Sequence, residues 1–529
     1  MSELTVRTAP LGGSALVRAA VEGALPTWFP PAPTDVAAWR RRAEEVRRHP
    51  GRTDWAERLA PAFAARGAAE ARLARAAQGR GIVITTGQQP GLFGGPVYTW
   101  SKALSALALA DAIEGATGVP TAPVFWAATD DADFGEAAAT WVALPGGAAH
   151  ISLPPPPIAG LPLAEVPLGD VGEQLATLAR AAGSVAHPDP LRLVERAYHS
   201  RATVGGAYLA LLRGLLEPLG IAVLDASHPL LRARADGLLR RALRRADVLD
   251  DALMARAAAL REAGFEPQVS PVSGLSLVFE RSEDGAKTRV PLPRAEAVAD
   301  DAQATLSSTV LLRPVVERHL LPTAAYVAGP GELAYFAQVG AVAETLDAEP
   351  PLALPRWSCT IIEPHVADLL DRYGLTEDDF REPHAAERTL ASTLMPTRVH
   401  DALRELRASV ERAGVVLREA GAPLLPDAVP DGFARRTGEQ LDRLERRYRA
   451  AVKRAEADVF RDLGTARGAL FPGGVRQERA LNLLPTLARH GPGVIDLMLD
   501  AARVHAGVLV HGAPSAVEAR RAAPAEVQL

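Results

Sequence analysis

Short apolar runs alternate with amphipathic stretches along most of the chain. The apolar runs have the length of buried strands, and the stretches between them place apolar residues three or four positions apart, as amphipathic helices do. Strands that alternate with helices form a largely parallel sheet with helical crossovers, so the pattern predicts an α/β core. The predicted strands lie at 81–87, 122–129, 220–227, 323–330 and 351–356.

The regions that lack this alternation predict an N-terminal helical region and two insertions in the core. Residues 33–80 show helical spacing, and we expect an N-terminal helical region over 1–80. The core then spans 81–380, and insertions interrupt it at about 140–200 and 255–305, where Pro- and Gly-rich segments replace the helical period. The second insertion has the pattern of a β-hairpin. Ligands of parallel sheets bind at the carboxyl ends of strands, where the two insertions would form the walls of a cleft.

Residues 385–465 predict two long helices in an antiparallel hairpin, and 466–529 predict helices that pack on the core. A Pro-rich breaker at 421–432 separates two heptad-like seams. The seam residues are Leu403, Leu406, Val410, Ala413 and Leu417 in the first helix and Leu441, Leu444, Tyr448, Val452, Ala455 and Val459 in the second. Spare apolar surface on this hairpin predicts a homodimer.

Basic residues crowd the second helix of the hairpin. One interpretation is a solvated, salt-bridged face, and the other is contact with a nucleotide or another anion. The residues are Arg435, Arg436, Arg443, Arg446, Arg447, Arg449, Lys453 and Arg454.

The composition excludes several classes of protein. A net charge of -5, from 58 basic and 63 acidic residues, gives no overall basic field for a nucleic acid. The single cysteine, Cys359, allows no intramolecular disulfide and fits a reducing compartment, so we expect a cytoplasmic protein. Charges or prolines interrupt the apolar runs before they reach about 18 residues, so we expect no membrane span.

A Gly-rich turn between the first strand and the next helix predicts a binding site. Residues 84–102 read ITTGQQPGLFGGPVYTWSK, which matches neither a P-loop nor a dinucleotide fingerprint. Glycines allow close approach of the backbone, and a helix that opens after Gly95-Pro96 could offer its first amides to an anion. The expected substrate-binding residues here are Thr86, Gly87, Gln88, Gln89, Gly95 and Tyr98.

The string TGQQPGLFGGPVYTWSKA resembles the signature of the cysteine-adding enzymes of bacillithiol biosynthesis, the BshC family, which is TGQQ-x-GL-x-x-GP-x-Y-x-x-x-K. Further matches follow in order: VFWAATDDADFGE at 124–136, LLRPVVERHLLPTAAYVAGPGELAYFAQV at 311–339, LPRWSCTIIEP at 354–364 and FPGGVRQERALNLLP at 471–485. The resemblance implies a Rossmann-like core, two connecting-peptide insertions and a coiled-coil domain. It also implies amide formation between the carboxyl of cysteine and the amine of glucosaminyl-malate.

Three aspartates follow the second predicted strand. Asp130, Asp131 and Asp133 could bind a metal, orient an amine or act as a general base, or they could cap the next helix. The family pattern more often reads E-D-H-D-F, whereas Ala132 occupies the histidine position here. We expect Asp131 and Asp133 to be catalytic, with no assigned metal ligands and with the metal requirement unknown.

Several other residues complete the expected site. Lys102 lies two turns into the helix, where it could reach a phosphate, and we expect it to be catalytic. Arg313 and Arg356 are cations within apolar segments, where an arginine usually has a carboxylate or phosphate partner. Glu332, after the turn that contains Gly331, is either a helix cap or a ligand of the substrate amine. Gln338 follows on a nearby turn.

The chemistry of amide formation indicates a co-substrate, and two alternative functions remain open. An amine does not attack a free carboxylate at useful rates, so we expect ATP to activate the cysteine carboxyl. The expected partners are therefore cysteine, glucosaminyl-malate and a nucleotide. One rival is a Rossmann-type sugar or nucleotide transferase. The other is a non-catalytic coiled-coil assembly protein.

Overall fold

The computed structural model describes residues 3–48, 54–421 and 424–512, which divide into two units. The core unit comprises Thr5–Trp141, His150–Ile361 and Glu478–Leu529, and the helical unit comprises Met1–Leu4, Val142–Ala149 and Ile362–Gln477. The helical unit begins before the boundary expected at 380. The reason is that α15 (Pro364–Tyr373) packs Val366 and Leu370 against other residues of the helical unit.

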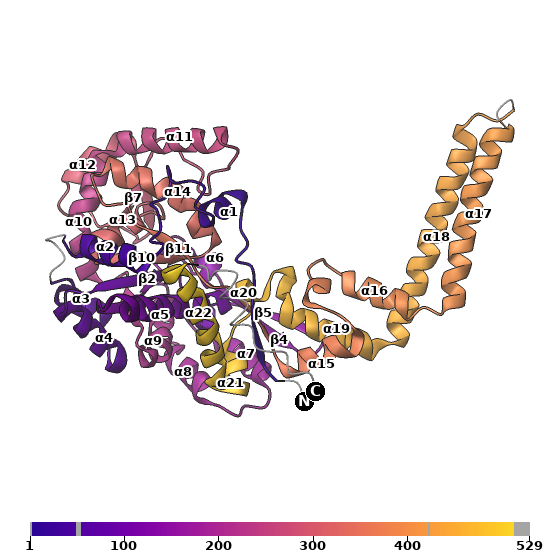
Figure 1. Cartoon of the computed structure of the whole chain (residues 1–529), viewed down its shortest axis with the longest axis horizontal. Helices are drawn as coiled ribbons and strands as arrows, with labels where there is room; N and C mark the ends of the chain where they lie inside the picture. Colours follow the sequence, from indigo (N-terminus) through magenta and orange to yellow (C-terminus); the bar gives the residue numbers. More distant parts are fainter. Residues whose placement is uncertain (1–2, 49–53, 422–423, 513–529) are drawn as a thin grey trace. The chain divides into compact units, whose positions relative to one another are not determined.

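A five-stranded parallel sheet lies at the centre of the core unit, in the order β11-β10-β2-β3-β6 (Figure 1). All five strands predicted from the sequence are confirmed. Their bounds are β2 (Ile82–Gln88), β3 (Thr121–Ala127), β6 (Ala222–Asp225), β10 (Thr323–Ala328) and β11 (Ala353–Pro355). The middle strands β2, β3 and β10 are almost wholly buried, which explains why each reads as a continuous apolar run.

The helix α5 (Val97–Thr117) packs on β2 and β3, and α22 (Gly493–His511) packs on α5. Because α5 is covered on several sides, small and apolar residues occupy its whole circumference over most of its length. A cluster of buried apolar side chains forms where α3 (Trp55–Phe63) and α4 (Gly67–Gln78) pack on residues of β2 and β3. These contacts fix the carboxyl ends of the two strands.

The N-terminal region is helical but begins with a strand that the sequence pattern missed. Its helices are α1 (Ala15–Val21), α2 (Val36–Arg47), α3 and α4. The strand β1 (Thr5–Thr8) pairs with β12 (Cys359–Ile362) in a separate two-stranded sheet. Four residues are too few to show a period, so this pairing is visible only in three dimensions.

The two insertions differ in structure. The first contains the paired strands β4 (Ala139–Leu144) and β5 (Gly147–Ser152), followed by three helices, α7 (Gly172–Ala182), α8 (Asp189–Ala197) and α9 (Val204–Leu216). The second forms a three-stranded antiparallel sheet from β7 (Leu275–Arg281), β8 (Lys287–Pro291) and β9 (Leu306–Ser308). The predicted hairpin in this insertion is confirmed as β7–β8.

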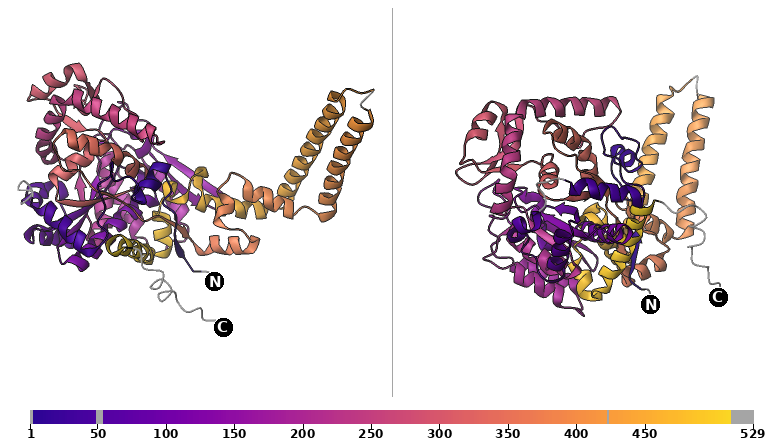
Figure 2. Two further views of the ribbon diagram at one scale, coloured as in Figure 1. Left: turned by 45° about the horizontal axis from the view of Figure 1, so that its top comes forward. Right: turned by 60° about the vertical axis from the view of Figure 1, so that its left-hand side comes forward.

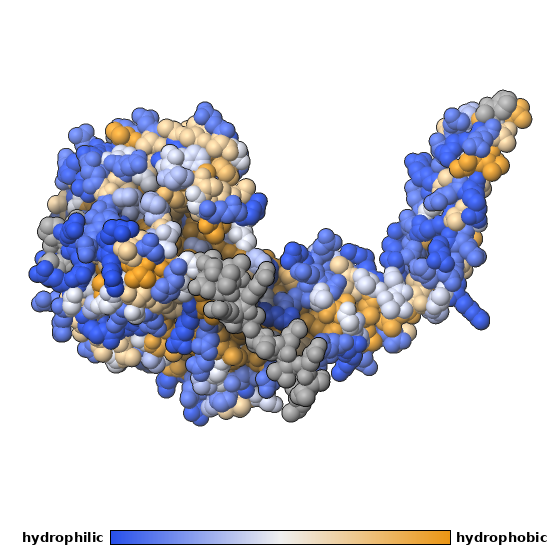
Figure 3. Space-filling model, in the orientation of Figure 1, coloured by the Kyte–Doolittle hydropathy of each residue, from blue (hydrophilic) through white to orange (hydrophobic). Residues whose placement is uncertain are grey.

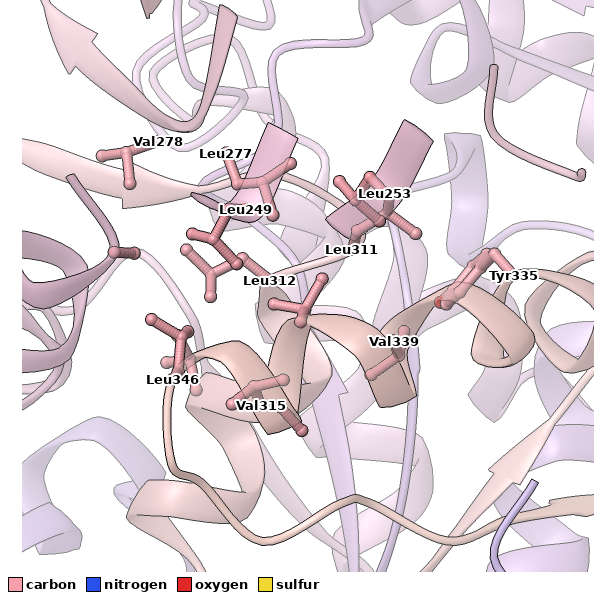
Figure 4. Packing of buried hydrophobic residues seen from close by; sticks show 14 of the residues in the cluster. Leu249, Leu253, Leu277, Val278, Leu311, Leu312, Val315, Tyr335, Val339 and Leu346 are labelled. Carbon is pink, nitrogen blue, oxygen red and sulfur yellow. The ribbon is translucent and has the colours of Figure 1, made fainter. Parts of the chain in front are cut away.

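A large apolar cluster joins the second insertion to the core. Leu249 and Leu253 from α11 (Ala246–Glu262) meet Leu277, Leu311 and residues of α14 (Pro330–Thr345) (Figure 4). The remaining helices of the core unit are α6 (Phe134–Ala137), α10 (Pro229–Arg244), α12 (Ala295–Asp300), α13 (Arg313–Leu320), α20 (Gln477–Ala480) and α21 (Leu484–His490).

The helical unit contains the predicted hairpin. Its two long helices, α17 (Thr397–Gly421) and α18 (Ala428–Ala455), lie side by side in every view (Figure 2). The predicted breaker is too long, because α18 already begins at Ala428 and accommodates Pro430 in its first turn, where proline is tolerated. Within that breaker, residues 422–423 lie outside the described residues. The shorter helices of this unit are α15, α16 (Ala385–Thr393) and α19 (Ala457–Leu470).

The seam between α17 and α18 differs from the predicted heptads. Leu406, Leu417 and Leu444 are 49%, 40% and 51% exposed, although all three were expected in the seam. The contact instead uses the small Gly414 opposite Ala434 and an ion pair from Arg407 to Asp442. Leu441, another residue of the predicted seam, is buried, so the predicted stripe is confirmed only in part.

Candidate active site

A cavity of about 700 Å³ lies at the carboxyl ends of β2, β3 and β10 in the core unit. The segments TGQQ, TDDAD and GPGE all reach it, as the sheet argument predicts. The segment DASH after β6 does not reach it. Its Asp225 accepts hydrogen bonds from Thr129 Oγ1 and from Ser227, and His228 caps α10.

The first segment needs glycine because the backbone is crowded. A Cβ on Gly87 would lie 3.0 Å from the carbonyl oxygen of Trp126 on β3. Thr86 is buried and donates its hydroxyl to Val327 O at 2.8 Å, so it braces the sheet and does not line the cavity. Gln88 and Gln89 do line the cavity, and Gln89 Nε2 donates to Asp131 at 2.8 Å.

The start of α5 is not the anion site that the sequence predicts. The amide of Val97 donates to Leu481 O at 2.9 Å, and Asn482 Nδ2 donates to Phe93 O at 3.0 Å. Gly95 lies outside the cavity lining, with a φ of 78° that favours glycine. The Gly-rich turn therefore packs against the segment after α20, and this expectation from the sequence is wrong.

Lys102 lines the cavity, but its ammonium is already occupied. It donates to Gly87 O at 2.8 Å and to Gln88 Oε1 at 2.8 Å, and it pairs with Glu332 at 2.6 Å. Burial lowers the pKa of Lys102, although the negative charge of Glu332 acts to raise it. An ammonium has three N–H groups, so Lys102 has none left for a phosphate. Its role in this structure is to hold the end of β2.

Glu332 is the centre of a buried ionic network. It caps α14 by accepting from Gly329 N at 2.8 Å, and it accepts from Tyr326 OH at 2.5 Å. Although burial opposes its charge, the Lys102 ammonium and these hydrogen bonds lower the pKa of Glu332. The carboxylate is therefore fully used inside the protein and serves as a helix cap.

Arg313 lines the cavity and extends the same network to Glu317. It pairs with Glu317 at 3.1 Å and donates to Tyr326 OH and Tyr335 OH, each at 3.2 Å. Glu317 also accepts from the hydroxyl of Thr85. Burial raises the pKa of Glu317 to about 7, against the charge of Arg313. We call Lys102, Glu332, Tyr326, Arg313 and Glu317 the ionic floor.

Arg356 is almost fully buried beside this floor. Its NH1 pairs with Glu478 at 2.9 Å and donates to Trp357 O. Its Nε, by contrast, has no hydrogen-bond partner among the described residues. A Cβ built on Gly329 would lie 3.6 Å from this Nε, so the absence of a side chain there leaves room beside it. Arg356 thus offers one donor at the cavity wall.

The side chains of the acidic segment after β3 accept hydrogen bonds from backbone amides of the same segment and from Gln89. Asp131 accepts from Gln89 and from the amide of Asp133, and Asp133 caps α6 by accepting from Glu136 N at 3.2 Å. Asp130 lies 3.7 Å from Lys287. The helix-cap interpretation therefore accounts for Asp133, and Ala132 lines the cavity between the two aspartates that the sequence analysis expected to be catalytic.

The sequence analysis missed five charged residues of the cavity lining: Asp250, Lys287 and Arg289 from the second insertion and its supporting helix, and the pair Glu136 and Arg479. Glu136 accepts from Gln88 Nε2 at 3.3 Å and from Tyr98 OH at 3.4 Å. Arg479, on α20, has no ion-pair partner within the described ranges. Both stand inside quoted motifs, Glu136 at the end of VFWAATDDADFGE and Arg479 within FPGGVRQERALNLLP. Their place in those strings was the available signal.

The wall formed by the second insertion and its supporting helix combines leucines with Asp250, Lys287 and Arg289. Leu249, Leu253, Leu277 and Leu311 reach it from the second insertion and its supporting helix (Figure 4). Gln338 holds this wall by two hydrogen bonds to the backbone of Val269, at 2.8 and 3.1 Å. Gly331 lines the cavity at the start of α14. The cavity is therefore lined by both apolar and charged side chains, as small-molecule sites commonly are.

The described residues contain neither a metal-binding cluster nor a membrane-spanning helix. In those ranges no cluster of three or more His, Cys, Asp or Glu side chains is arranged to hold a metal ion. No helix in the same ranges is long and apolar enough to cross a membrane.

The fold and the cavity define a Rossmann-like protein with a small-molecule site at the carboxyl ends of its parallel strands and a coiled-coil helical hairpin. Comparison with known families then narrows the class. Residues 21–291 and 293–357 match the N-terminal Rossmann-like domain of the bacillithiol biosynthesis protein BshC, and residues 359–508 match its C-terminal coiled-coil domain.

Curated relatives give the same result. A protein of Solibacter usitatus (strain Ellin6076) is 35% identical over 79% of this chain and 82% of its own length. One of Salinibacter ruber (strain DSM 13855 / M31) is 31% identical over 80% and 81%, respectively. One of Symbiobacterium thermophilum (strain DSM 24528 / JCM 14929 / IAM 14863 / T) is 28% identical over 92% and 96%. Each is named "Putative cysteine ligase BshC". The chain belongs to the BshC family, and the resemblance stated from its motifs is confirmed.

Proposed function

We propose that the protein is a ligase that joins the carboxyl of L-cysteine to the amine of glucosaminyl-malate during bacillithiol biosynthesis. Family membership supports this proposal, and the observation that carries it is the distribution of charge in the cavity. Carboxylates from the segment after β3 lie in the same cavity as Arg356 and Arg479. Each of the two substrates carries an amino group and at least one carboxylate, so a cavity with both signs of charge suits the pair.

The cysteine carboxyl must be activated before the amine can attack it. We propose ATP as the activating reagent, which would convert the carboxyl into an acyl phosphate or an adenylate. Arg479 and the unpaired Nε of Arg356 are the cations that could neutralise a phosphate here. Lys102 is not proposed for this task, because Gly87, Gln88 and Glu332 occupy its three N–H groups.

Two measurements test the proposal. In cells, deletion of the gene should abolish bacillithiol and accumulate glucosaminyl-malate, as measured by thiol labelling and mass spectrometry. In vitro, the purified chain should consume ATP only when cysteine and glucosaminyl-malate are both present. Unchanged bacillithiol after deletion would contradict the ligase. Turnover of a sugar nucleotide without cysteine would favour a transferase, and a chain that turns over neither set would favour an assembly protein.

We also propose that the α17–α18 hairpin forms a homodimer. Apolar side chains that the predicted seam should have buried are exposed on it, including Leu406, Leu417 and Leu444. Val416, Leu424 and Phe433 add to this surface, at 60%, 88% and 44% exposed. Figure 3 shows apolar atoms gathered near one end of an otherwise hydrophilic hairpin. Surfaces of this kind commonly mark contacts between protein chains.

The dimer is tested by charge substitution on the exposed face. L406K/L417K should sediment as a monomer, whereas the wild-type chain should sediment as a dimer. L424S is expected to weaken the dimer less, since it removes one side chain without adding charge. A wild-type chain that sediments as a monomer at all accessible concentrations would contradict this proposal and leave the ligase proposal intact.

A further inference from the structure

The carboxylates that line the cavity differ in how much of their hydrogen-bonding capacity is already used. Glu332 is enclosed by Lys102, Tyr326 and Gly329. Asp131 accepts one bond on each oxygen, and Asp133 caps α6. A base that takes a proton from a substrate needs an oxygen that the protein has left open. Glu332 and Asp131 do not meet that requirement, and Asp133, whose Oδ2 receives no hydrogen bond within the described residues, is tied to the backbone of α6 through Oδ1.

Glu136 meets it. Both of its side-chain contacts, from Gln88 and Tyr98, go to Oε1 and are long, at 3.3 and 3.4 Å. Its Oε2 receives no hydrogen bond from any residue within the described ranges. The side chain is exposed and belongs to the cavity lining. A substrate in the cavity can therefore meet a carboxylate oxygen without breaking an internal bond.

The ionic floor fixes the position of Glu136 through one intermediary. Lys102 donates to Gln88 Oε1 at 2.8 Å, which orients the side-chain amide so that Nε2 points to Glu136. Tyr98 OH receives the same Nε2 at 3.1 Å and donates to Glu136. Lys102 and Gln88 are thus positioning residues for Glu136.

We propose that Glu136 is the general base that accepts the proton of the attacking amine. This inference rests on the proposed ligase function and names a residue of that same site. The step begins with the activated cysteine, an acyl phosphate or adenylate, and the amino group of glucosaminyl-malate. The nitrogen forms a C–N bond to the acyl carbon, the bond between the acyl carbon and the bridging phosphate oxygen breaks, and phosphate or AMP leaves with the electron pair. The proton lost from nitrogen is transferred to Glu136 Oε2.

The surroundings of Glu136 favour proton uptake at moderate pH. Partial desolvation, followed by the charges of Asp133 and Asp131, raises the pKa of Glu136 above its ordinary value. Lys102 and the hydrogen bond from Tyr98 oppose this rise in the pKa. The charged and titratable groups around it are Asp131 and Asp133 on its own segment, Tyr98 and Lys102 on α5, Tyr208 on α9 and Arg479 on α20. A general base is most effective when its pKa approaches the working pH.

The test compares the full-length wild type, E136Q and E136A. E136Q keeps the shape of the side chain but cannot accept a proton, so kcat for amide formation should fall about 10²- to 10⁴-fold. Wild-type kcat should rise with pH as Glu136 ionises, and this rise should be absent in E136Q. Added formate should partly restore E136A, which a purely structural residue would not permit. E173Q, on the exposed surface of α7, is the matched control and should behave as wild type.

The outcomes separate the two proposals. A wild-type chain that forms no amide overturns the ligase itself. A wild-type chain that forms amide, together with an E136Q chain of equal rate and equal pH profile, overturns only the role of Glu136. Loss of rate in E136Q with an unchanged pH profile and no rescue of E136A by formate would also overturn it, since that result indicates a structural contact.

Discussion

The ionic floor, of which all members except Glu317 line the cavity, and the acidic segment after β3 use their charges in opposite ways. In the floor, Lys102, Glu332 and Arg313 are buried and bonded to one another. In the acidic segment, Glu136 is exposed and keeps one oxygen open. Burial forces charges to find internal partners, because an unpaired buried charge is costly. Charged residues at the heart of a site can therefore be scaffold, and the reactive group can lie at its margin.

The largest expected effect comes from breaking a pair in the floor. Lys102→Met leaves Glu332 buried without its cation, which should reduce the free energy of unfolding by about 3 to 5 kcal/mol. Denaturant unfolding of the purified variant measures this loss. The matched control is K102M/E332Q, which removes both charges and should recover part of the stability. If K102M were as stable as wild type, the floor would not be a buried ionic unit.

The second prediction concerns the pH dependence of the floor. The pKa of Glu317 is about 7 in the folded chain, against 4.5 for an unperturbed glutamate. The folded state then binds more protons between these values, so stability from this group is full below pH 4.5 and is lost as pH rises through about 7. The loss amounts to about 3 kcal/mol. E317Q, which stays neutral, should lack it.

Denaturant unfolding of both chains across this pH range isolates the contribution of Glu317. The difference in unfolding free energy between E317Q and wild type should grow in favour of E317Q as pH rises from acidic to neutral. A difference that stays constant with pH would show that Glu317 ionises normally inside the floor, and the contrast with the exposed segment would weaken.

The fold was largely predictable because its signals are local. Each of the five parallel strands is a continuous apolar run, and such runs stand out from their helical surroundings. The seam of the hairpin was not predictable in the same way. Gly414, Ala434 and the Arg407–Asp442 pair form the contact, and none of them belongs to an apolar repeat. Seams that depend on small residues and ion pairs need the partner helix to be recognised.

The location of the site was predictable, but the role of each residue was not. Strand ends placed Gln88, Asp131 and Glu332 correctly at one cavity. The sequence could not show that Lys102 and Glu332 pair with each other, since 230 positions separate them and only the fold brings them to 2.6 Å. For the same reason Glu136 was not among the residues predicted for the site. Which oxygen remains open depends on every neighbour.

A smaller effect is expected from the acidic segment. Asp133→Asn weakens the cap of α6, which has only four residues, and should cost about 1 kcal/mol or less. Asparagine is itself a good cap, so Asp133→Ala is the more severe companion. Thermal unfolding compares both with K102M. Losses for Asp133 as large as those for Lys102 would erase the distinction between a buried floor and an exposed segment.

The smallest effect on stability is expected at Arg479. It is exposed on α20, lines the cavity and has no ion-pair partner in the described part of the chain. Arg479→Gln should therefore change the free energy of unfolding by no more than about 0.5 kcal/mol. If Arg479 neutralises an anionic group of a substrate, the KM for that substrate should rise while stability is retained. Steady-state kinetics with cysteine, glucosaminyl-malate and ATP varied in turn identifies which substrate is affected.

The exposed control R503Q on α22, whose partner Asp500 lies one turn away, should leave all three KM values unchanged. An R479Q chain that loses stability but keeps its KM values would place Arg479 with the scaffold.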